Sequence, residues 1–234
     1  GGGMYSTYSD NTFTNVTFAG NSGDGMYSRS SNNTFTTVTF ESNSRYGMRG
    51  SLGSNNTFTD VTFQENGNHG AFIGGLTGGD TVDAVNVRFL GNEGVGIVVQ
   101  SSTASIANAI FSGNTADGDG GGIYIASRST VSIANAIFSG NTADGNGSGI
   151  YIGRSSTASI ANAIFSGNTA DGNGGGLYIS GDSSPQLSNL TFTNNTASRG
   201  GALYVTGLNS FPTLTNSILW GNSASSGPEI YVDD

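Results

Sequence analysis

A short motif, Phe-x-x-Asn, recurs along the whole chain and constrains its fold more than any other feature. Copies follow one another at intervals of 22 to 27 residues. Eight copies carry phenylalanine and a ninth carries leucine: Phe18, Phe40, Phe63, Phe89, Phe111, Phe138, Phe165, Phe192 and Leu219. The asparagine column is complete: Asn21, Asn43, Asn66, Asn92, Asn114, Asn141, Asn168, Asn195 and Asn222. A fixed period of this kind indicates a repeat architecture.

The length and content of each repeat indicate strands. Repeats of 22 to 27 residues are too short for most helix-pair units, and their glycines oppose helices. Each repeat divides into three short runs, for example Ser-Ile-Ala, Ala-Ile-Phe and Gly-Ile-Tyr-Ile, separated by Gly, Asn, Asp and Ser. We therefore predict an all-β parallel β-helix with three short strands per coil and about nine to ten coils, stacked about 4.8 Å apart.

Stacked coils place equivalent residues in columns, which we call ladders. Alternation along a strand turns Phe18 and Val16 inward and Thr17 outward. The asparagines three residues after each Phe are predicted to form an internal ladder of amide hydrogen bonds, and the column described next is predicted to form a second one. A second polar column precedes each Phe by three residues: Asn15, Thr37, Asp60, Asn86, Asn108, Asn135, Asn162, Asn189 and Asn216. Asn tolerates the left-handed backbone conformation, so bends between strands are expected at these columns.

The chain is interpreted as one β-helix domain, residues 1–234. Residues 1–70 form short, Thr-rich coils, and residues 96–234 form longer coils with a Thr-Ala-Asp-Gly loop. Residues 71–95 form an irregular coil, with a bulge or loop expected around positions 74–80.

Composition excludes several classes of protein. The net charge is −9 and Lys is absent, so no basic patch is available for nucleic acid. No run approaches 18 apolar residues, which opposes a membrane-spanning helix. Cysteine is absent, which excludes disulfides and thiolate metal sites. This acidic, Thr/Asn/Gly-rich composition is typical of a secreted protein at the cell surface or outside the cell. No signal peptide precedes the repeats, and the chain begins in mid-repeat, as expected for a processed chain or a fragment.

The motifs carry a family resemblance. Phe-x-x-Asn copies that alternate with Gly-Gly-Gly-Leu (174–177) and Gly-Gly-Ala-Leu (200–203) resemble the repeats of polymorphic outer-membrane proteins. The whole chain resembles the right-handed parallel β-helix proteins of the pectate-lyase-like superfamily. The resemblance implies a right-handed solenoid. It implies no single activity, since that superfamily includes lyases, glycosidases, adhesins and autotransporter passengers.

No catalytic constellation stands out. A lyase of that superfamily would use Arg or Lys as a base, but the seven arginines are scattered. A glycosidase needs two carboxylates at a set separation, and the acidic residues here fall mostly in turns. The only histidine, His69, precedes a Gly turn and has no obvious partner. We therefore predict no catalytic residues and no enzymatic activity, with a polysaccharide lyase or glycosidase as the enzymatic alternative.

One acidic column is the only candidate for a metal. Asp117, Asp144 and Asp171 occupy the same loop position in three consecutive coils. Stacked carboxylates repel one another unless they are solvated or bridged by a cation, and Ca²⁺ prefers such oxygens. Both interpretations stay open here, and no other cofactor is expected.

Two features favour self-association. Both ends of the sequence read as parts of coils, so we expect Gly1, Met4 and Tyr5 of one copy to meet Ile230, Tyr231 and Val232 of another, end to end. In addition, alternation turns Ile110, Ile137 and Ile164 outward, as an apolar stripe for a lateral partner or a covering loop.

The predicted function is therefore an extracellular structural or adhesive β-solenoid that assembles head-to-tail into a filament. Its partners would be copies of itself and surface glycans, with no nucleic acid. Three alternatives stay open: a passenger or adhesin fragment of a larger protein, a carbohydrate-active enzyme, and an ice-binding protein. The last rests on Thr-x-Thr rungs in the first three coils (12–14, 34–36 and 57–59).

Overall fold

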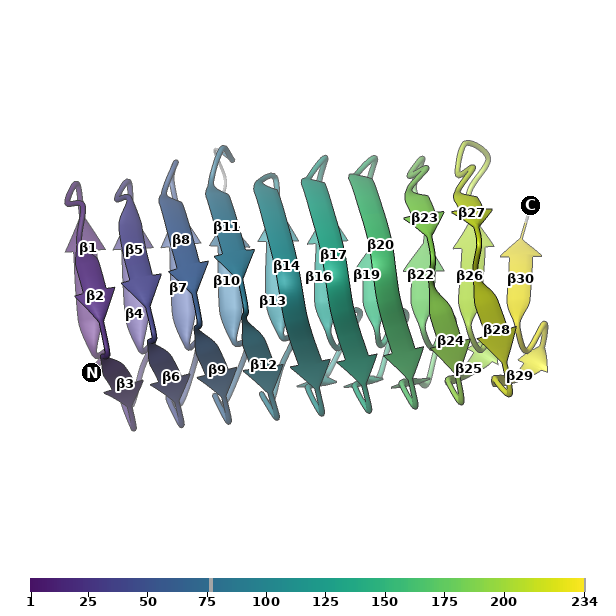
Figure 1. Cartoon of the computed structure of the whole chain (residues 1–234), viewed down its shortest axis with the longest axis horizontal. Coiled ribbons are helices and arrows are strands. Elements are labelled where there is room, and N and C mark those ends of the chain that lie inside the picture. The colour runs from purple at the N-terminus through teal and green to yellow at the C-terminus, as the bar shows by residue number, and fades with distance from the viewer. Residues whose placement is uncertain (76–77, 234) are drawn as a thin grey trace.

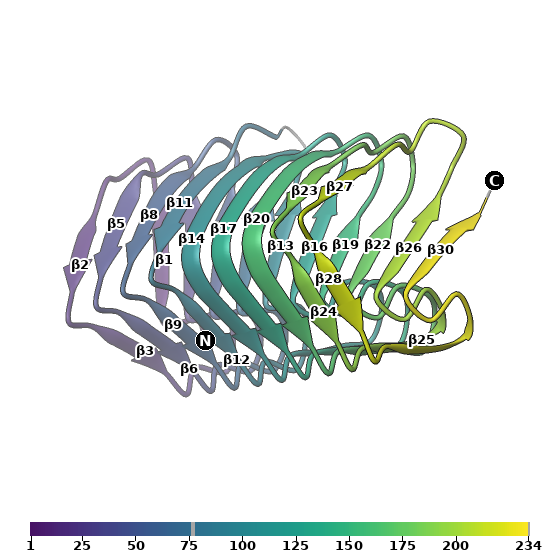
Figure 2. The same cartoon turned by 45° about the vertical axis from the view of Figure 1, so that its right-hand side comes forward.

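Parallel strands stack in three sheets along one axis in the computed structural model, which describes residues 1–75 and 78–233 (Figures 1 and 2). The described residues contain no helix, and hence none that is long and apolar enough to cross a membrane. The fold prediction is confirmed: the chain is an all-β, right-handed parallel solenoid.

Sheet A has ten strands, one from each coil. They are β1 (Met4–Thr7), β4 (Met26–Arg29), β7 (Met48–Ser51), β10 (Ala71–Gly74), β13 (Ile97–Gln100), β16 (Ile123–Ala126), β19 (Ile150–Ile152), β22 (Leu177–Ile179), β26 (Leu203–Thr206) and β30 (Ile230–Asp233).

Sheet B has fifteen strands and bends sharply along its length. They are β2 (Thr12–Thr14), β3 (Thr17–Ala19), β5 (Asn33–Thr36), β6 (Thr39–Glu41), β8 (Asn55–Thr59), β9 (Thr62–Gln64), β11 (Thr81–Val85), β12 (Arg88–Leu90), β14 (Thr103–Ser112), β17 (Thr130–Ser139), β20 (Thr157–Ser166), β23 (Gln186–Ser188), β24 (Thr191–Thr193), β27 (Thr213–Thr215) and β28 (Ile218–Trp220).

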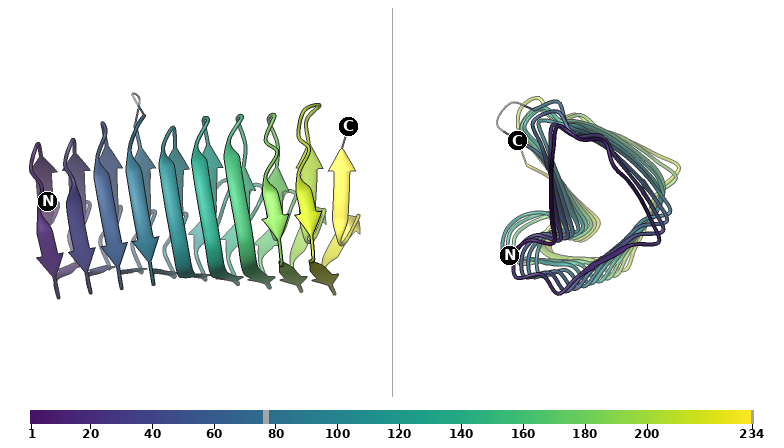
Figure 3. Two further views of the ribbon diagram at one scale, coloured as in Figure 1. Left: turned by 45° about the horizontal axis from the view of Figure 1, so that its top comes forward. Right: turned by 90° about the vertical axis from the view of Figure 1, so that its left-hand side faces the viewer.

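Sheet C is short and belongs to the later coils. Its strands are β15 (Thr115–Ala116), β18 (Thr142–Ala143), β21 (Thr169–Ala170), β25 (Thr196–Arg199) and β29 (Ser223–Ser226). The end-on view shows the resulting angular cross-section, with an indentation beside sheet A (Figure 3).

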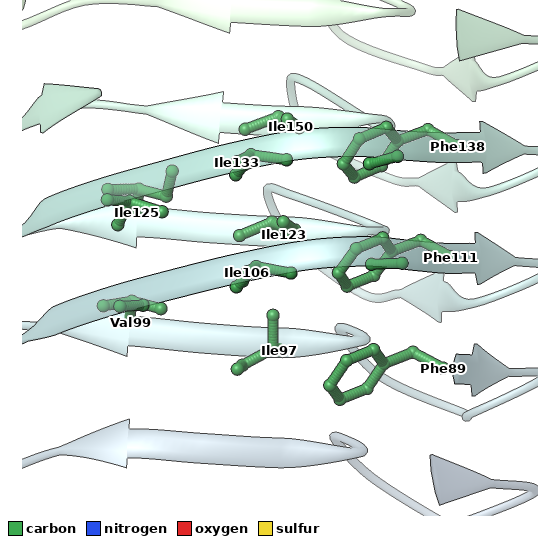
Figure 4. Close-up of a cluster of buried hydrophobic side chains, with 14 of the residues drawn as sticks. Phe89, Ile97, Val99, Ile106, Phe111, Ile123, Ile125, Ile133, Phe138 and Ile150 are labelled. Atoms are coloured by element: carbon green, nitrogen blue, oxygen red, sulfur yellow. The ribbon is translucent and has the colours of Figure 1, made fainter. Parts of the chain in front are cut away.

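The phenylalanine ladder fills the core, as predicted. Phe89, Phe111 and Phe138 are fully buried, with ring centroids 4.9 and 4.7 Å apart and rings within 3° of parallel. Figure 4 shows these rings stacked beside buried isoleucines of sheets A and B, such as Ile106 and Ile123. Because parallel in-register pairing repeats each residue at the strand spacing, one residue type can fill the core along the whole axis.

The two asparagine columns have different roles: one bonds between coils in the interior, and the other forms the bend in the backbone. The column three residues after each Phe, which we call the inner ladder, is confirmed. Its buried Asn141 donates from Nδ2 to the backbone carbonyl oxygen of Phe111 at 3.0 Å and to Oδ1 of Asn168 at 2.9 Å. The outer column holds the left-handed bend, for example Asn108 with φ 54° and Asn135 with φ 56°. Its amides also bond from coil to coil, but its members are exposed, so the second ladder is not internal as predicted.

The outer column divides sheet B into two facets. We call the residues before the bend the first facet and those after it the second facet; in β17 these are 130–134 and 136–139.

Sheet A continues through the coil of residues 71–95, since β10 pairs with both β7 and β13. The loop expected around positions 74–80 includes Leu76 and Thr77, which lie outside the described residues. The division into three regions stays a prediction.

Candidate binding groove on sheet A

A column of mostly aromatic side chains runs along the outer face of sheet A. Cα pairing places ten residues in one register: Tyr5, Tyr27, Arg49, Phe72, Val98, Tyr124, Tyr151, Tyr178, Tyr204 and Tyr231. The sequence analysis did not identify this column. Its signal was the third residue of each Gly-Ile-Tyr-Ile run, which alternation turns outward when its neighbours turn inward.

Five tyrosines at the C-terminal half of the column form a continuous stack. Centroids lie 4.9 to 5.4 Å apart from Tyr124 to Tyr231, and the rings are within 12° of parallel. Stacking covers the ring faces, so the edges and hydroxyl groups are what a ligand meets. Burial raises the pKa of Tyr124 and of Tyr178. Burial, together with a hydrogen bond donated to Asp233 Oδ2 at 2.6 Å, raises the pKa of Tyr204 to about 12.

Arginine interrupts the column in the N-terminal half. The guanidinium carbon of Arg49 lies 5.2 Å from the ring centroid of Tyr27, 5.7 Å from that of Phe72 and 5.9 Å from that of Tyr46. These distances allow cation–π attraction on three sides. Arg49 therefore continues the stack as a flat cation between aromatic rings.

A pocket opens where the column carries its smallest side chain. Phe72, Val98 and Tyr124 form its floor, and the loops that precede sheet A form its wall. Its volume is about 380 Å³. Val98 fills less space than the tyrosine that follows it, so the gap between Phe72 and Tyr124 becomes the hollow.

Three carboxylates line this pocket: Glu93, Asp117 and Asp119. Asp119 accepts hydrogen bonds at Oδ1 from the backbone N–H and the side-chain amide of Asn146, at 2.7 and 3.0 Å. The polar wall thus joins an aromatic floor, an arrangement that binding sites use to fix the orientation of a polar ligand.

His69 also lines the pocket, but it has a structural role. Its Nδ1 accepts a hydrogen bond from the backbone N–H of Val95 at 3.0 Å. Burial lowers the pKa of His69 to about 4, so the ring is neutral at physiological pH. The sequence analysis found no partner for this histidine, and its partner proves to be a backbone amide one coil away.

The three aspartates proposed for Ca²⁺ do share one column. Asp117, Asp144 and Asp171 are exposed on successive coils, where the backbone continues the pairing of sheet C, and of the three Asp117 lines the pocket. Across residues 1–75 and 78–233, no group of three or more His, Cys, Asp or Glu side chains is arranged to hold a metal ion. The Ca²⁺ assignment stays a prediction.

The assembly candidates lie away from this groove or at its ends. Ile137 and Ile164 are 41% and 44% exposed on the second facet of sheet B, and Ile110 is half-buried beside them. The remaining candidates lie in the first and last coils, where Tyr5 and Tyr231 begin and end the aromatic column: Gly1, Met4, Tyr5, Ile230, Tyr231 and Val232.

Comparison with known families fits this architecture. The family described as "Right handed beta helix region" matches residues 1–142 and 75–234, which together span the chain. The chain belongs to this right-handed β-helix family. No curated protein matches it.

Two solved structures resemble this member of the β-helix family. The first is the catalytic domain of a GH87 α-1,3-glucanase in complex with tetrasaccharides: TM-score 0.51, 14% identity, 92% of this chain and 49% of that one. The chain thus spans about half the length of the glucanase domain. The second is HetL, a pentapeptide-repeat protein from the cyanobacterium Nostoc: TM-score 0.34, 11% identity, 96% of this chain and 87% of that one.

Proposed function

We propose that this β-helix is a non-catalytic, extracellular adhesive solenoid that binds a neutral polysaccharide along the groove of sheet A. The observation that carries the proposal is the pocket between Phe72 and Tyr124, which combines an aromatic floor with carboxylate acceptors. Tyrosine hydroxyl groups and carboxylates both accept hydrogen bonds from sugar hydroxyls, and the aromatic floor adds apolar contact.

The shape of the groove favours an extended ligand. Tyrosines recur at centroid spacings of 4.9 to 5.4 Å beyond the pocket. Tyr151, Tyr178 and Tyr231 are half-buried and offer a similar contact, whereas Tyr204 is buried. A polymer laid along the axis would gain from each contact, and weak contacts made by one chain add up through effective concentration. The glucanase that shares this fold was solved with tetrasaccharides, which supports the ligand class but not the activity.

The charge of the groove selects among polysaccharides. Glu93, Asp117 and Asp119 line the pocket, and exposed Asp144 and Asp171 continue the column of Asp117 in the next two coils. Like charges opposed across an interface are unfavourable, so an anionic glycan is disfavoured at this pocket. We therefore expect neutral glucans to bind and polyuronates to bind weakly.

Affinity electrophoresis and calorimetry with neutral glucans test the proposal. Tyr124→Ala should weaken binding about tenfold or more, because it removes part of the aromatic floor of the pocket. Phe211→Ala is the matched control, because Phe211 is an aromatic residue that is 70% exposed and does not line the pocket. Equal affinity of both variants, or binding of polyuronate alone, would overturn the proposal.

The carboxylates of the pocket favour one second function, a glycoside hydrolase. Hydrolysis would use one carboxyl as acid and another as base or nucleophile. Release of reducing sugar from a bound glucan, lost in Asp117→Asn or Asp119→Asn, would replace the adhesive function by this one. The head-to-tail filament stays a prediction, to be tested by electron microscopy of the purified chain.

A further inference from the structure

We propose an internal binding site for one water molecule beside Gly50, on the inner face of sheet A, where β7 pairs with β10. The water takes the place of a serine hydroxyl that the two preceding coils carry at the equivalent position. The site lies in the interior of the solenoid, so the proposal is independent of the proposed function.

A serine and an asparagine form a buried polar corner between sheets A and B in each of the first two coils. Asn11 Nδ2 donates to Ser6 Oγ at 2.8 Å, and Asn33 Nδ2 donates to Ser28 Oγ at 2.8 Å. The same two amides also donate along the axis, Asn11 to Asn33 Oδ1 at 2.8 Å and Asn33 to Asn56 Oδ1 at 3.1 Å. Each amide nitrogen thus has two acceptors, one hydroxyl in its own coil and one amide oxygen in the next.

Asn56, the next asparagine of this corner, has neither of these acceptors. Cα pairing aligns Gly50 with Ser28 and Val82 with Asn56, and neither Gly50 nor Val82 offers a side-chain oxygen. Asn56 is 2% exposed, and its Nδ2 makes no hydrogen bond to any of the residues that the structure describes. A buried donor without an acceptor is strongly unfavourable, so this nitrogen indicates a partner other than the protein.

Gly50 leaves room for that partner. A Cβ at Gly50 would lie 3.3 Å from Asn56 Nδ2, 3.6 Å from Ile73 Cδ1 and 3.9 Å from the carbonyl oxygen of Phe72. None of these neighbours fills the position of the side chain that Ser28 carries one coil earlier, and the atom nearest to this position is the unpaired nitrogen. A water molecule is similar in size to a serine hydroxymethyl group, so it fits where that group is missing.

A second unpaired group lies at the same corner. Ser28 Oγ is 3.4 Å from the carbonyl oxygen of Ser31 and 3.4 Å from Ser54 Oγ. One coil further the equivalent groups are the carbonyl oxygen of Ser54 and the carboxylate of Asp80, since the N–H of Ser31 bonds to Ser54 and that of Ser54 bonds to Asp80. Asp80 is fully buried, and its Oδ2 has no hydrogen-bond partner within residues 1–75 and 78–233. The water would accept from Asn56 and donate to Ser54 and Asp80, and three bonds are typical of a buried water.

Direct observation of the water tests the site. A high-resolution crystal structure of the wild type should show one ordered water within about 3 Å of Asn56 Nδ2. In solution, the side-chain amide of Asn56 should show a nuclear Overhauser effect to water. Gly50→Ser supplies the hydroxyl and should displace this water. Ser28→Gly removes the hydroxyl one coil earlier and should add a water beside Asn33 Nδ2.

The stabilities of Gly50→Ser and Gly50→Ala provide a matched comparison. Both substitutions add a Cβ at the same place, but only serine offers an acceptor to Asn56. Alanine fills the space of the water with a methyl group and leaves the nitrogen unpaired. In urea unfolding, the unfolding equilibrium constant of Gly50→Ser should therefore be about tenfold smaller than that of Gly50→Ala.

Three results would overturn the proposal. They are a wild type without an ordered water beside Asn56, a water that stays there in Gly50→Ser, and equal stability of Gly50→Ser and Gly50→Ala. Circular dichroism checks that each variant folds. The first result needs no substitution, so it decides the question even if a variant misfolds.

Discussion

Replacing Asn141 by Asp isolates the contribution of the inner asparagine ladder. The substitution keeps the oxygen that accepts from the backbone N–H and Nδ2 of Asn114, at 3.2 and 2.9 Å. It replaces the donor Nδ2 by an oxygen that faces two other oxygens, those of Phe111 and Asn168. Two buried hydrogen bonds are lost at about 1 kcal/mol each, and the opposed buried oxygens cost about 1–3 kcal/mol more. We expect Asn141→Asp to lower the free energy of unfolding by about 3–5 kcal/mol at neutral pH.

The penalty of Asn141→Asp should depend on pH in a defined direction. Burial against oxygens raises the pKa of the introduced carboxyl above its unfolded value. Below the unfolded value of about 3.9 the carboxyl is protonated in both states, and its O–H restores one of the two donated bonds. As the pH rises from the unfolded pKa through the folded pKa, the unfolded state ionises more readily than the folded state. The free energy of unfolding of the variant therefore falls over this range. The stability difference from wild type should therefore grow from acidic to neutral pH.

Asn135→Asp is the matched control for this experiment. Asn135 lies in the same coil, is exposed, and donates one bond to Asn108 Oδ1 at 3.2 Å. Asp also tolerates the left-handed backbone there, so a cost under about 1 kcal/mol is expected. Urea unfolding followed by circular dichroism gives the total, and hydrogen exchange in β14 and β17 localises it, because solenoids need not unfold in one step. Equal penalties for the two variants would refute the division of tasks between the ladders.

Three further predictions follow from particular contacts. Gly122→Ala should destabilise the fold by several kcal/mol in thermal melts, because a Cβ there meets a backbone oxygen of the next coil at 2.5 Å. Gly118→Ala is the control and should be nearly neutral, because a Cβ there meets open space. Because burial lowers the pKa of His69 to about 4, folding stability should fall as the pH drops from about 6.5 toward 4, and His69→Gln should flatten that part of the urea-unfolding profile. Tyr204→Phe should remove the phenol with a pKa of about 12 from the ultraviolet titration, and an unchanged titration would contradict the bond to Asp233.

The repeat alone was sufficient to predict the solenoid. A column such as Phe111 and Phe138, repeated at a near-constant interval, stacks in register only if successive coils lie one above the other. The inner ladder followed for the same reason, since equal residues at equal intervals become neighbours. Outward isoleucines were likewise predictable, because side-chain direction alternates along a strand.

The groove was not predictable from the same pattern. Tyr124 and Tyr151 were visible as parts of apolar runs, but their rings stack outside the core rather than within it. Their face is enclosed by loops whose path depends on turns that the sequence does not specify. Likewise, Glu93 and Asp119 come from different coils, so their approach to one pocket depends on the size of the turn before each strand of sheet A.

The sequence by itself therefore determined the periodic part of this protein: the coil, its core ladders and the direction of each side chain in a strand. Only the tertiary structure decided what breaks the period, namely Arg49 between aromatic rings, the hollow above Val98 and the exposure of Trp220. The physical reason is that a repeat fixes neighbours along the axis through strand spacing. Contacts between a strand and the loops beside it depend on where each turn ends. Local conformational propensity does not determine the end of a turn.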